Sequence, residues 1–289
     1  MGTSSVFAEW RLALVLRLHV LRSRLVRRAV GPHAAAILAH TARGDFLVAP
    51  EDVGVGRRLR RDGAVVDDEI DAVLAHCRPD SRVLVVGGHV GSLALPLAAS
   101  VASVTVLEAN PDTFGLLRRN VAINGLANVD VHAVAANDRG GTLRFLLNRA
   151  NSGGSKRVPQ HARTAYYYDR PDEVEVPAVV LDDYFAGRTF DVIVMDIEGS
   201  EVFALRGMPR LLGACRHLFV EFLPHHLRDV AGVGVAEFLA PLARHFAQLT
   251  IPSQGRTIPA EAIARELEAM FARDAGDPSL VFHRDAPSA

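Results

Sequence analysis

The feature that most constrains the fold is a repeated succession of a short apolar run, a glycine turn and a helical pattern, which begins at Arg82. Arg82–Val86 (RVLVV) is β-branched without polar alternation, as expected of a strand buried on both faces. Strands that alternate with helices predict a doubly wound, mostly parallel α/β sheet, which binds ligands outside the carboxyl ends of its strands. The expected strands are 82–86, 103–108, 129–134, 142–147, 190–197, 218–222, 246–251 and 279–283. The expected helices are 92–99, 110–125, one from 201, 235–244 and 259–273, and a polar loop over the site is expected at 148–177.

The N-terminal part has a different pattern. Residues 7–30 are predicted to be helical, because apolar side chains recur at every third or fourth position and form a stripe. The stripe consists of Phe7, Trp10, Leu14, Leu18, Leu21 and Leu25. Six arginines against Glu9 make this segment basic, and docking on the domain, dimerisation and contact with a membrane surface all remain open for it. A short helix over 34–41, a loop-rich stretch over 44–63 and a helix over 67–76 are expected next. We place a helical segment and linker at 1–65 and the α/β domain at 66–289.

Composition excludes several classes of protein. With 32 basic and 33 acidic side chains the net charge is −1, so binding to nucleic acid by bulk electrostatics is not expected. No run of 18 apolar residues predicts a membrane-spanning helix, and no secretory signal is recognised. Cys77 and Cys215 form no C-x-x-C pair, so we predict neither a disulfide framework nor a cysteine zinc site. A cytoplasmic protein is expected.

Two features at the strand ends predict a ribose-bearing cofactor. Gly87 and Gly91 follow the first strand, where a backbone without side chains can approach a ligand. Glu108 ends the second strand, 21 residues after Gly87, where an acid can accept both ribose hydroxyls. NAD and S-adenosylmethionine both qualify, although the G-x-G-x-x-G spacing of a dinucleotide site is absent. Asn137 and Asp138, after the third strand, are either acceptors for an adenine amino group or a plain turn.

Carboxylates and histidines gather after the fourth and fifth strands. Asp196 and Glu198 are two residues apart, so both are expected on one face of an extended strand exit. Either Glu198 is the general base for a hydroxyl nucleophile or it only bonds backbone amides in its own turn. The acids and histidines of this region are Asp196, Glu198, Glu201, Glu221, His225 and His226. A divalent cation held by the acids is an alternative, but no dense ligand motif such as H-E-x-x-H is present and we predict no metal site.

Five segments resemble the FkbM-type methyltransferases in order and spacing, over roughly Val53 to His283. They are GGHVGS, VLEANPDTFGLLRRNVAINGLANV, VPAVVLDDYF, MDIEGSEVFALRGM and FVEF. The resemblance implies a class I S-adenosylmethionine-dependent methyltransferase fold with seven strands, the last one antiparallel. It further implies transfer to a hydroxyl of a natural product, a sugar or a lipid-linked glycan.

The resemblance also implies roles for individual residues. Gly87 and Gly91 would shape the methionine pocket, Glu108 would hold the ribose, Asp138 would face adenine and Asp196 would lie near the amino group and sulfonium. The full set of expected cofactor residues is Gly87, Gly88, His89, Gly91, Ser92, Glu108, Ala109, Asn110, Asn137, Asp138 and Asp196. The expected catalytic residues are Glu198, Asp196 and His225. The chain departs from the family at two positions, with Val85 where an Asp is usual and His89 where an Asn is usual.

Three hypotheses about function follow. The first is an O-methyltransferase that uses S-adenosylmethionine and acts on a small-molecule or glycan acceptor. The second is an NAD-dependent oxidoreductase on a Rossmann-like fold, which rests on the glycine turn and Glu108 alone. The third is a non-catalytic binding protein with a decayed cofactor site, which rests on Val85 and His89.

Overall fold

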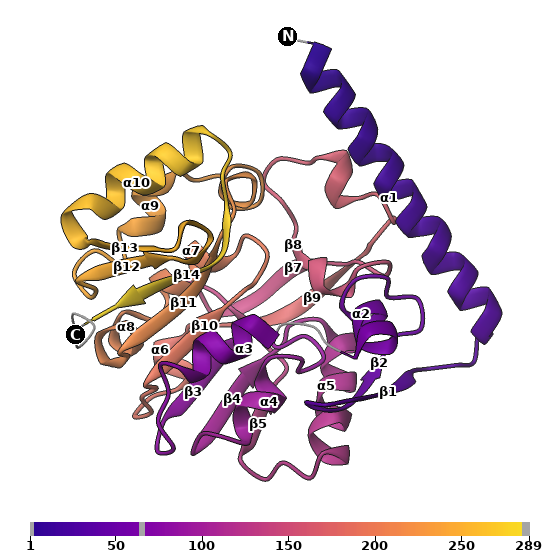
Figure 1. Cartoon of the computed structure of the whole chain (residues 1–289), viewed down its shortest axis with the longest axis horizontal. Coiled ribbons are helices and arrows are strands. Elements are labelled where there is room, and N and C mark those ends of the chain that lie inside the picture. Colours follow the sequence, from indigo (N-terminus) through magenta and orange to yellow (C-terminus); the bar gives the residue numbers. More distant parts are fainter. Residues whose placement is uncertain (1–2, 64–66, 285–289) are drawn as a thin grey trace.

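The computed structural model describes residues 3–63 and 67–284, with side chains from residue 11 onward. Its main sheet has the order β13-β12-β14-β11-β10-β3-β4-β5 (Figure 1). The strands are β3 (Arg82–Val86), β4 (Ser103–Leu107), β5 (Val129–His132), β10 (Val192–Met195), β11 (His217–Phe222), β12 (Gln248–Ile251), β13 (Arg256–Pro259) and β14 (Asp277–His283). Strands β5, β4, β3, β10 and β11 run parallel, and β14 is antiparallel to both of its neighbours. This confirms the predicted doubly wound sheet with an antiparallel last strand. Strand β13 was not predicted, and it extends the sheet by pairing antiparallel with β12.

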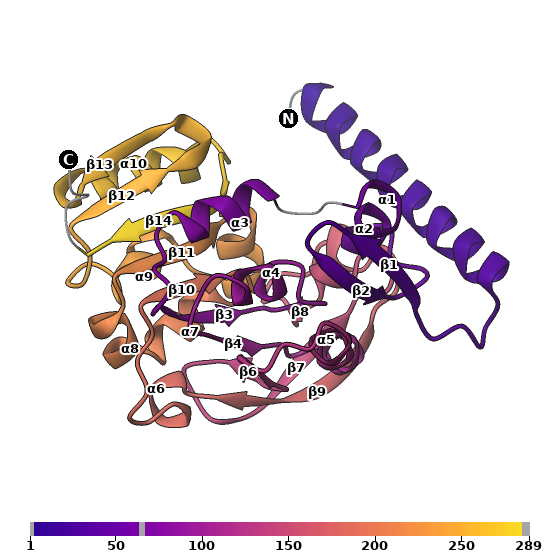
Figure 2. The ribbon, with the colours of Figure 1, turned by 60° about the horizontal axis from the view of Figure 1, so that its bottom comes forward.

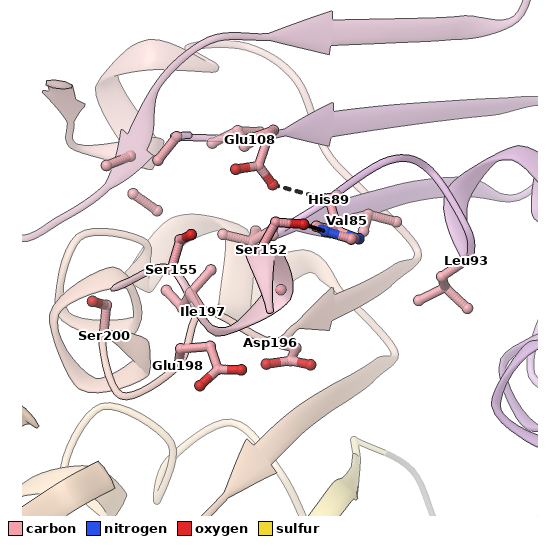
Figure 3. A pocket seen from close by; sticks show the side chains of 18 of the residues that line it. Val85, His89, Leu93, Glu108, Ser152, Ser155, Asp196, Ile197, Glu198 and Ser200 are labelled. Atoms are coloured by element: carbon pink, nitrogen blue, oxygen red, sulfur yellow. Dashed lines mark hydrogen bonds between the residues drawn. The ribbon is translucent and has the colours of Figure 1, made fainter. Parts of the chain in front are cut away.

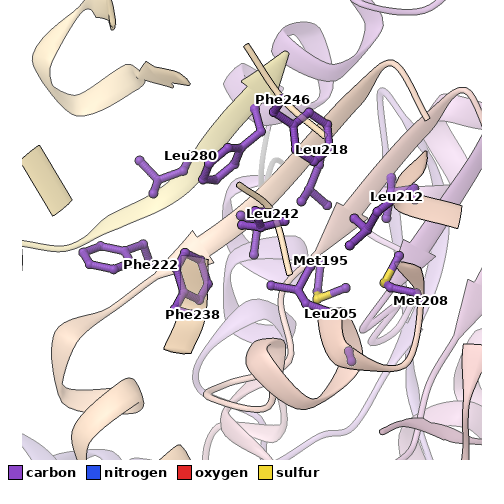
Figure 4. Packing of buried hydrophobic residues seen from close by; sticks show 14 of the residues in the cluster. Met195, Leu205, Met208, Leu212, Leu218, Phe222, Phe238, Leu242, Phe246 and Leu280 are labelled. Carbon is purple, nitrogen blue, oxygen red and sulfur yellow. The ribbon is translucent and has the colours of Figure 1, made fainter. Parts of the chain in front are cut away.

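Helices cover both faces of this sheet and enclose one apolar cluster on each. They are α3 (Asp67–Leu74), α4 (Ala94–Ala98), α5 (Pro111–Ile123), α6 (Leu181–Tyr184), α7 (Glu201–Arg206), α8 (Pro209–Ala214), α9 (Val235–Leu239) and α10 (Ala260–Ala272). Along β3, Leu84 and Val86 belong to one cluster while Val83 and Val85 belong to the other, so the strand is buried on both faces as predicted. Figure 4 shows the first cluster, where Phe222 and Phe238 pack near Leu280.

Helix α5 begins where its sequence predicts. The Asn110 side chain accepts hydrogen bonds from the backbone amides of Asp112 (3.0 Å) and Thr113 (3.3 Å), and Pro111 occupies the first turn. Gly125, with φ +64°, follows the helix in the left-handed conformation that glycine favours. The start of this helix is therefore fixed directly after the end of β4.

The helix predicted over 34–41 is wrong. The chain instead forms the antiparallel hairpin β1 (Ile37–Thr41) and β2 (Gly44–Val48), and the stretch expected to be loop-rich also contains α2 (Val55–Asp62). Asn120 and Asn124, on α5 and just after it, bond the backbone of β2. The Asn120 Oδ1 accepts from the Leu47 amide at 2.7 Å, and the Asn124 Oδ1 accepts from the Asp45 amide at 2.9 Å. These partners lie more than 70 residues away, so the local pattern could not indicate them.

The loop predicted over 148–177 is only partly irregular. The chain folds into a second sheet of order β6-β9-β7-β8, of which Figure 2 shows β6, β7 and β9 below β3 and β4. Its strands are β6 (Ala135–Ala136), β7 (Gly141–Leu147), β8 (Lys156–Arg157) and β9 (Asp172–Val179). Strand β9 alternates acidic and apolar residues, and its composition is therefore that of a solvated loop. Its apolar face nevertheless packs in a third core cluster.

The predicted N-terminal helix is confirmed as α1 (Thr3–Val30), which projects along one side of the molecule (Figures 1 and 2). Ser23 is buried, and Arg27 ties the end of the helix to the domain through the Ala34 carbonyl (2.7 Å) and Glu51. The described leucines of the stripe, from Leu14 to Leu25, are exposed, so the stripe is not the face that docks. The side chains of Phe7 and Trp10 and the expected boundary at 65/66 lie outside the described residues. No helix in the described ranges is long and apolar enough to cross a membrane.

Candidate functional site

A cavity of about 280 Å³ lies at the carboxyl ends of β3, β4 and β10 and is also lined by residues of the second sheet and of the segment that leads to β8. Figure 3 shows side chains that line it. This is the edge of the sheet at which the sequence places a ligand. The cavity wall includes the predicted residues Gly87, Gly88, His89, Ser92, Glu108, Ala109, Asp196 and Glu198. Gly91, Asn110, Asn137, Asp138 and His225 do not line it.

The glycines after β3 are required by protein packing. A Cβ on Gly87 would lie 1.9 Å from the Asp196 carbonyl oxygen, and a Cβ on Gly88 would lie 2.1 Å from Val106 Cγ1. Gly87 and Gly91 also have φ of +96° and +92°, which side chains disfavour. Helix α4 begins only at Ala94, so Ser92 lies in the turn before it. The turn thus brings backbone to the cavity wall because neighbouring strands leave no room for side chains.

Glu108 connects two segments at the cavity wall. Its Oε2 accepts from the His89 amide and its Oε1 from the Asn110 amide, each at 2.7 Å. Each carboxylate oxygen keeps a second lone pair for a ligand. Burial raises the pKa of Glu108 to about 7, although these amide bonds oppose the shift.

His89 lines the same cavity and has one unpaired ring nitrogen. Its Nε2 lies 2.7 Å from Ser152 Oγ, which in turn donates to Asp52 Oδ2 at 2.5 Å. Its Nδ1 is buried and has no hydrogen-bond partner in the described part of the chain. A buried polar atom without a partner is costly, so a bound ligand that pairs with it would remove this cost.

The wall next to Glu108 is apolar and suits a planar base. It consists of Leu107, Ala109, Val134, Ala135, Ala136, Leu143 and Phe145. Asn137 and Asp138 follow this wall but turn away from the cavity, and the Asn137 side chain donates to the Arg139 carbonyl at 3.1 Å. Their predicted contact with adenine has no support in this geometry. Asn110 instead caps α5 and donates to Ser155 Oγ at 3.2 Å.

The opposite end of the cavity is acidic. The Asp196 side chain is accessible from the cavity but surrounded by protein, and burial together with Glu198 and Glu201 raises its pKa well above the usual range. Glu69 of α3 also lines this end, and burial raises its pKa too. No sequence pattern pointed to Glu69, because acids in the first turn of a helix are explained by the helix dipole.

Behind Glu198 lies a buried cluster of charged and polar groups that we call the lysine cluster, consisting of Lys156, Glu198, Glu221 and His226. Lys156 Nζ donates to Glu198 Oε2 at 2.7 Å and lies 3.4 Å from His226 Nε2. His226 Nδ1 lies 3.0 Å from Glu221 Oε2. Burial, with Lys156 adding to it, lowers the pKa of His226 to about 2.

The histidine of this cluster is His226, whereas the sequence predicted His225 as the catalytic histidine. His225 contacts His226 with ring centroids 4.3 Å apart and the rings tilted by 53°, but it does not line the cavity. Lys156, which sequence reasoning missed, is the only lysine of the chain and comes from β8. Its uniqueness was the one available signal, and the abundance of arginine in this sequence explained it equally well.

The turn after β10 leaves the Glu198 carboxylate free for Lys156. Glu198 has φ +57° and Gly199 has φ +97°. The backbone amides of Ile197 and Gly199 donate to Glu201 Oε1 at 2.9 and 3.3 Å. The amide-bonding role considered for Glu198 is therefore filled by Glu201, the first residue of α7.

The carboxylates of this turn also meet the distance requirement for a shared cation. Oxygen atoms of Asp196, Glu201 and Glu221 lie within 4.8 Å of one another. Glu201 already accepts two amide bonds and Glu221 is paired with His226. A cation could therefore use the carboxylate of Asp196 and the lone pairs that remain on Glu201 and Glu221.

Comparison with known proteins places this site in a family. A family model described as the methyltransferase FkbM domain matches residues 86–246, more than half of the chain. Similar solved structures include an FkbM methyltransferase from Methylobacillus flagellatus KT, with 19% identity over 72% of this chain and 44% of that chain at a TM-score of 0.42. An rRNA methylase from Streptococcus thermophilus has 11% identity over 76% of this chain and 95% of that chain, with a TM-score of 0.43. This chain therefore spans less than half the length of the first of these proteins. No curated protein matches the sequence.

We predict that Glu108 makes the stability of the protein depend on pH. Its pKa rises from 4.5 to about 7 on folding, so the folded state holds the proton more tightly. Its contribution to the free energy of unfolding is then fully present below the unfolded-state pKa of 4.5 and is lost as pH rises from there through about 7.

Thermal melts across this pH range should test the prediction with Glu108→Gln, which cannot ionise. The melting temperature of the wild type should fall relative to that of Glu108→Gln as pH rises. Asp112→Asn, an exposed carboxylate on α5, is the matched control and should run parallel to the wild type. Parallel curves for the wild type and Glu108→Gln would contradict the raised pKa.

Proposed function

This chain belongs to the FkbM methyltransferase family, and on that premise we propose that it transfers the methyl group of S-adenosylmethionine to a hydroxyl of a small-molecule or glycan acceptor. The observation that carries the proposal is one cavity with an apolar wall and Glu108 at one end and a cluster of carboxylates at the other. These two ends suit the nucleoside and the positively charged part of this cofactor.

The charge of the cavity favours S-adenosylmethionine over NAD. Four carboxylate side chains line it, from Glu69, Glu108, Asp196 and Glu198, against the single arginine Arg58. A sulfonium and an ammonium group are attracted by such a wall, whereas the pyrophosphate of NAD is repelled. The oxidoreductase hypothesis therefore loses its support.

The groups that line the cavity fit each part of S-adenosylmethionine. The free lone pairs of Glu108 can accept ribose hydroxyls, and the apolar wall beside Ala109 can hold adenine. Asp196 and Glu69 can neutralise the ammonium group. When bound, the cofactor supplies a methyl group activated by a positive sulfur.

Glu69 can also replace the acid that is missing at position 85, where this chain has Val85. Both side chains line the cavity, so α3 can provide the acid that the family usually carries at the strand. Asp196 and Glu69 are close enough for Glu69 to raise the pKa of Asp196. We infer that the site is intact, which argues against a decayed binding protein.

The acceptor hydroxyl must lose its proton as its oxygen is methylated, and Glu198 is the best-placed group to take that proton. Its carboxylate borders the cavity, and the 2.7 Å bond from Lys156 fixes its position. Burial and the nearby Lys156 lower the pKa of His226, which disfavours this ring as the proton acceptor. It instead connects Glu221 to the rest of the lysine cluster.

We predict that Glu198→Gln slows methyl transfer by about 10²–10⁴-fold while the affinity for S-adenosylmethionine changes little, because the substitution keeps shape and removes basicity. Transfer of labelled methyl groups to a panel of sugar and polyketide alcohols measures the rate, and calorimetry measures the affinity. His225→Gln is the control, since His225 does not line the cavity, and it should keep the wild-type rate. Full turnover by folded Glu198→Gln would exclude Glu198 as the base.

We also predict that Glu69→Gln weakens S-adenosylmethionine binding roughly tenfold to a hundredfold, which corresponds to about 1.5–3 kcal/mol for an interaction with a charged group. Asp68→Asn, an exposed neighbour on the same helix, is the matched control and should bind normally. Calorimetric titration of both variants measures the effect. An unchanged dissociation constant for Glu69→Gln would show that α3 does not replace the acid missing at Val85.

A further inference from the structure

Three histidines meet at the edge of the main sheet opposite the cavity. His217 begins β11 and His283 ends β14, and the antiparallel register places them directly across from each other. His76 lies in the turn after α3 and contacts both rings. We propose that these residues, here called the histidine triad, bind a transition-metal cation of the zinc type.

The spacing of the three rings fits one shared ion. The Nδ1 atoms of His217 and His283 are 3.1 Å apart, and one ligand atom from each residue lies within 4.8 Å of the others. The ring centroids are 4.7, 5.2 and 5.3 Å apart. Zinc–nitrogen bonds of about 2.0–2.1 Å in tetrahedral geometry separate the nitrogens by about 3.3–3.4 Å, so a small adjustment would complete the site.

Hydrogen bonds already orient two of the rings for this role. His76 Nδ1 lies 2.9 Å from the Ala72 carbonyl, which can only accept, so Nδ1 carries the proton and Nε2 is left as the ligand. His283 Nε2 lies 2.8 Å from Thr250 Oγ1, which directs Nδ1 toward His217. Metal-binding histidines are held in this way by a partner on the second nitrogen.

The ligand atoms of the triad favour a cation that prefers nitrogen ligands. The three candidate ligands are all imidazoles, which suit zinc, copper and nickel rather than calcium or magnesium. Three protein ligands are also the number found in open zinc sites.

Calorimetric titration of the chelator-treated full-length protein with zinc sulfate tests this proposal. We expect one ion per chain and a zinc-dependent rise in the melting temperature. His76→Ala and His217→Ala should each weaken zinc binding at least tenfold, and both sites are half-buried, so the fold is expected to tolerate them. His161→Ala, an exposed single histidine, is the control and should bind zinc normally.

A second titration with cobalt gives an independent measure, because a tetrahedral nitrogen site produces an intense visible absorption. The wild type should show this band, and His76→Ala and His217→Ala should lose it. Absence of zinc binding by the wild type would overturn the proposal. So would zinc binding that survives in both variants, since the ion would then sit elsewhere, for example at Asp196, Glu201 and Glu221.

A separate observation concerns the exposed face of α1. Leu14, Leu18, Leu21 and Leu25 follow one another at intervals of four, three and four residues, which places them on one face of the helix. They are 41–59% exposed, while the opposite side of the helix, at Ser23 and Arg27, meets the domain. Four exposed leucines in a row form an apolar surface that needs a partner.

Arginines border this leucine stripe on both sides. Arg17, Arg24 and Arg28 share one flank, and Arg11 and Arg22 share the other. All five are exposed, and none of them pairs with a carboxylate among the described residues. An antiparallel second copy would bring these positive flanks against each other, whereas lipid phosphates complement them. We propose that α1 lies on an anionic membrane surface, with its leucines among the acyl chains.

Sedimentation with phosphatidylcholine vesicles, with or without phosphatidylglycerol, tests this second proposal. The protein should bind only the anionic vesicles, and added salt should weaken binding. Leu18→Glu and Leu21→Glu should each reduce binding at least tenfold, while Ile123→Glu, an equally exposed apolar residue on α5, should not. Equal binding to both vesicle types, or a dimer in solution with no vesicle binding, would overturn the proposal.

Discussion

The structure of the site depends on the buried Glu108 carboxylate and on the hydrogen bonds that it accepts from two backbone amides. A carboxylate buried next to apolar strands is costly, and hydrogen bonds to its oxygens offset that cost. The bonds join the turn after β3, at His89, to the start of α5, at Asn110. Both residues then reach the segment before β8, His89 through Ser152 and Asn110 through Ser155. One side chain therefore fixes the cavity wall, a helix start and the covering segment relative to one another.

The other end of the cavity is organised by charge. Asp196, Glu201 and Glu221 all have raised pKa values, because burial and mutual repulsion disfavour their ionised forms. A single buried ammonium group, that of Lys156, opposes this excess of acid through its bond to Glu198. A cationic cofactor would lower the repulsion further, so the electrostatics of this end of the cavity agree with the proposed ligand. Removing Lys156 would leave Glu198 unpaired, which is costly in a buried site.

The predicted features that the structure confirms are those whose cause is local. The strand Arg82–Val86 is buried because the four residues after the exposed Arg82 are all apolar, and the Asn110 side chain caps the helix that begins at Pro111. The predicted features that fail depend on distant partners. The hairpin β1–β2 is held by Asn120 and Asn124, and β9 is a strand because it pairs with β7. Periodicity in one segment carries no information about such partners.

The sequence by itself determined the fold class, the edge of the sheet that carries the site, and the positions of Glu108, Asp196 and Glu198 at the ends of strands. Each follows from short-range pattern and from the rule that parallel strands end together. Only the tertiary structure decided that Glu69 lines the cavity, that Lys156 and His226 lie together behind Glu198, and that Asn137, Asp138 and His225 do not line the cavity. The histidine triad likewise joins residues 76, 217 and 283, which no motif connects. The physical reason is that side-chain direction and long-range strand pairing bring these groups together, and neither is encoded in the spacing of residues along the chain.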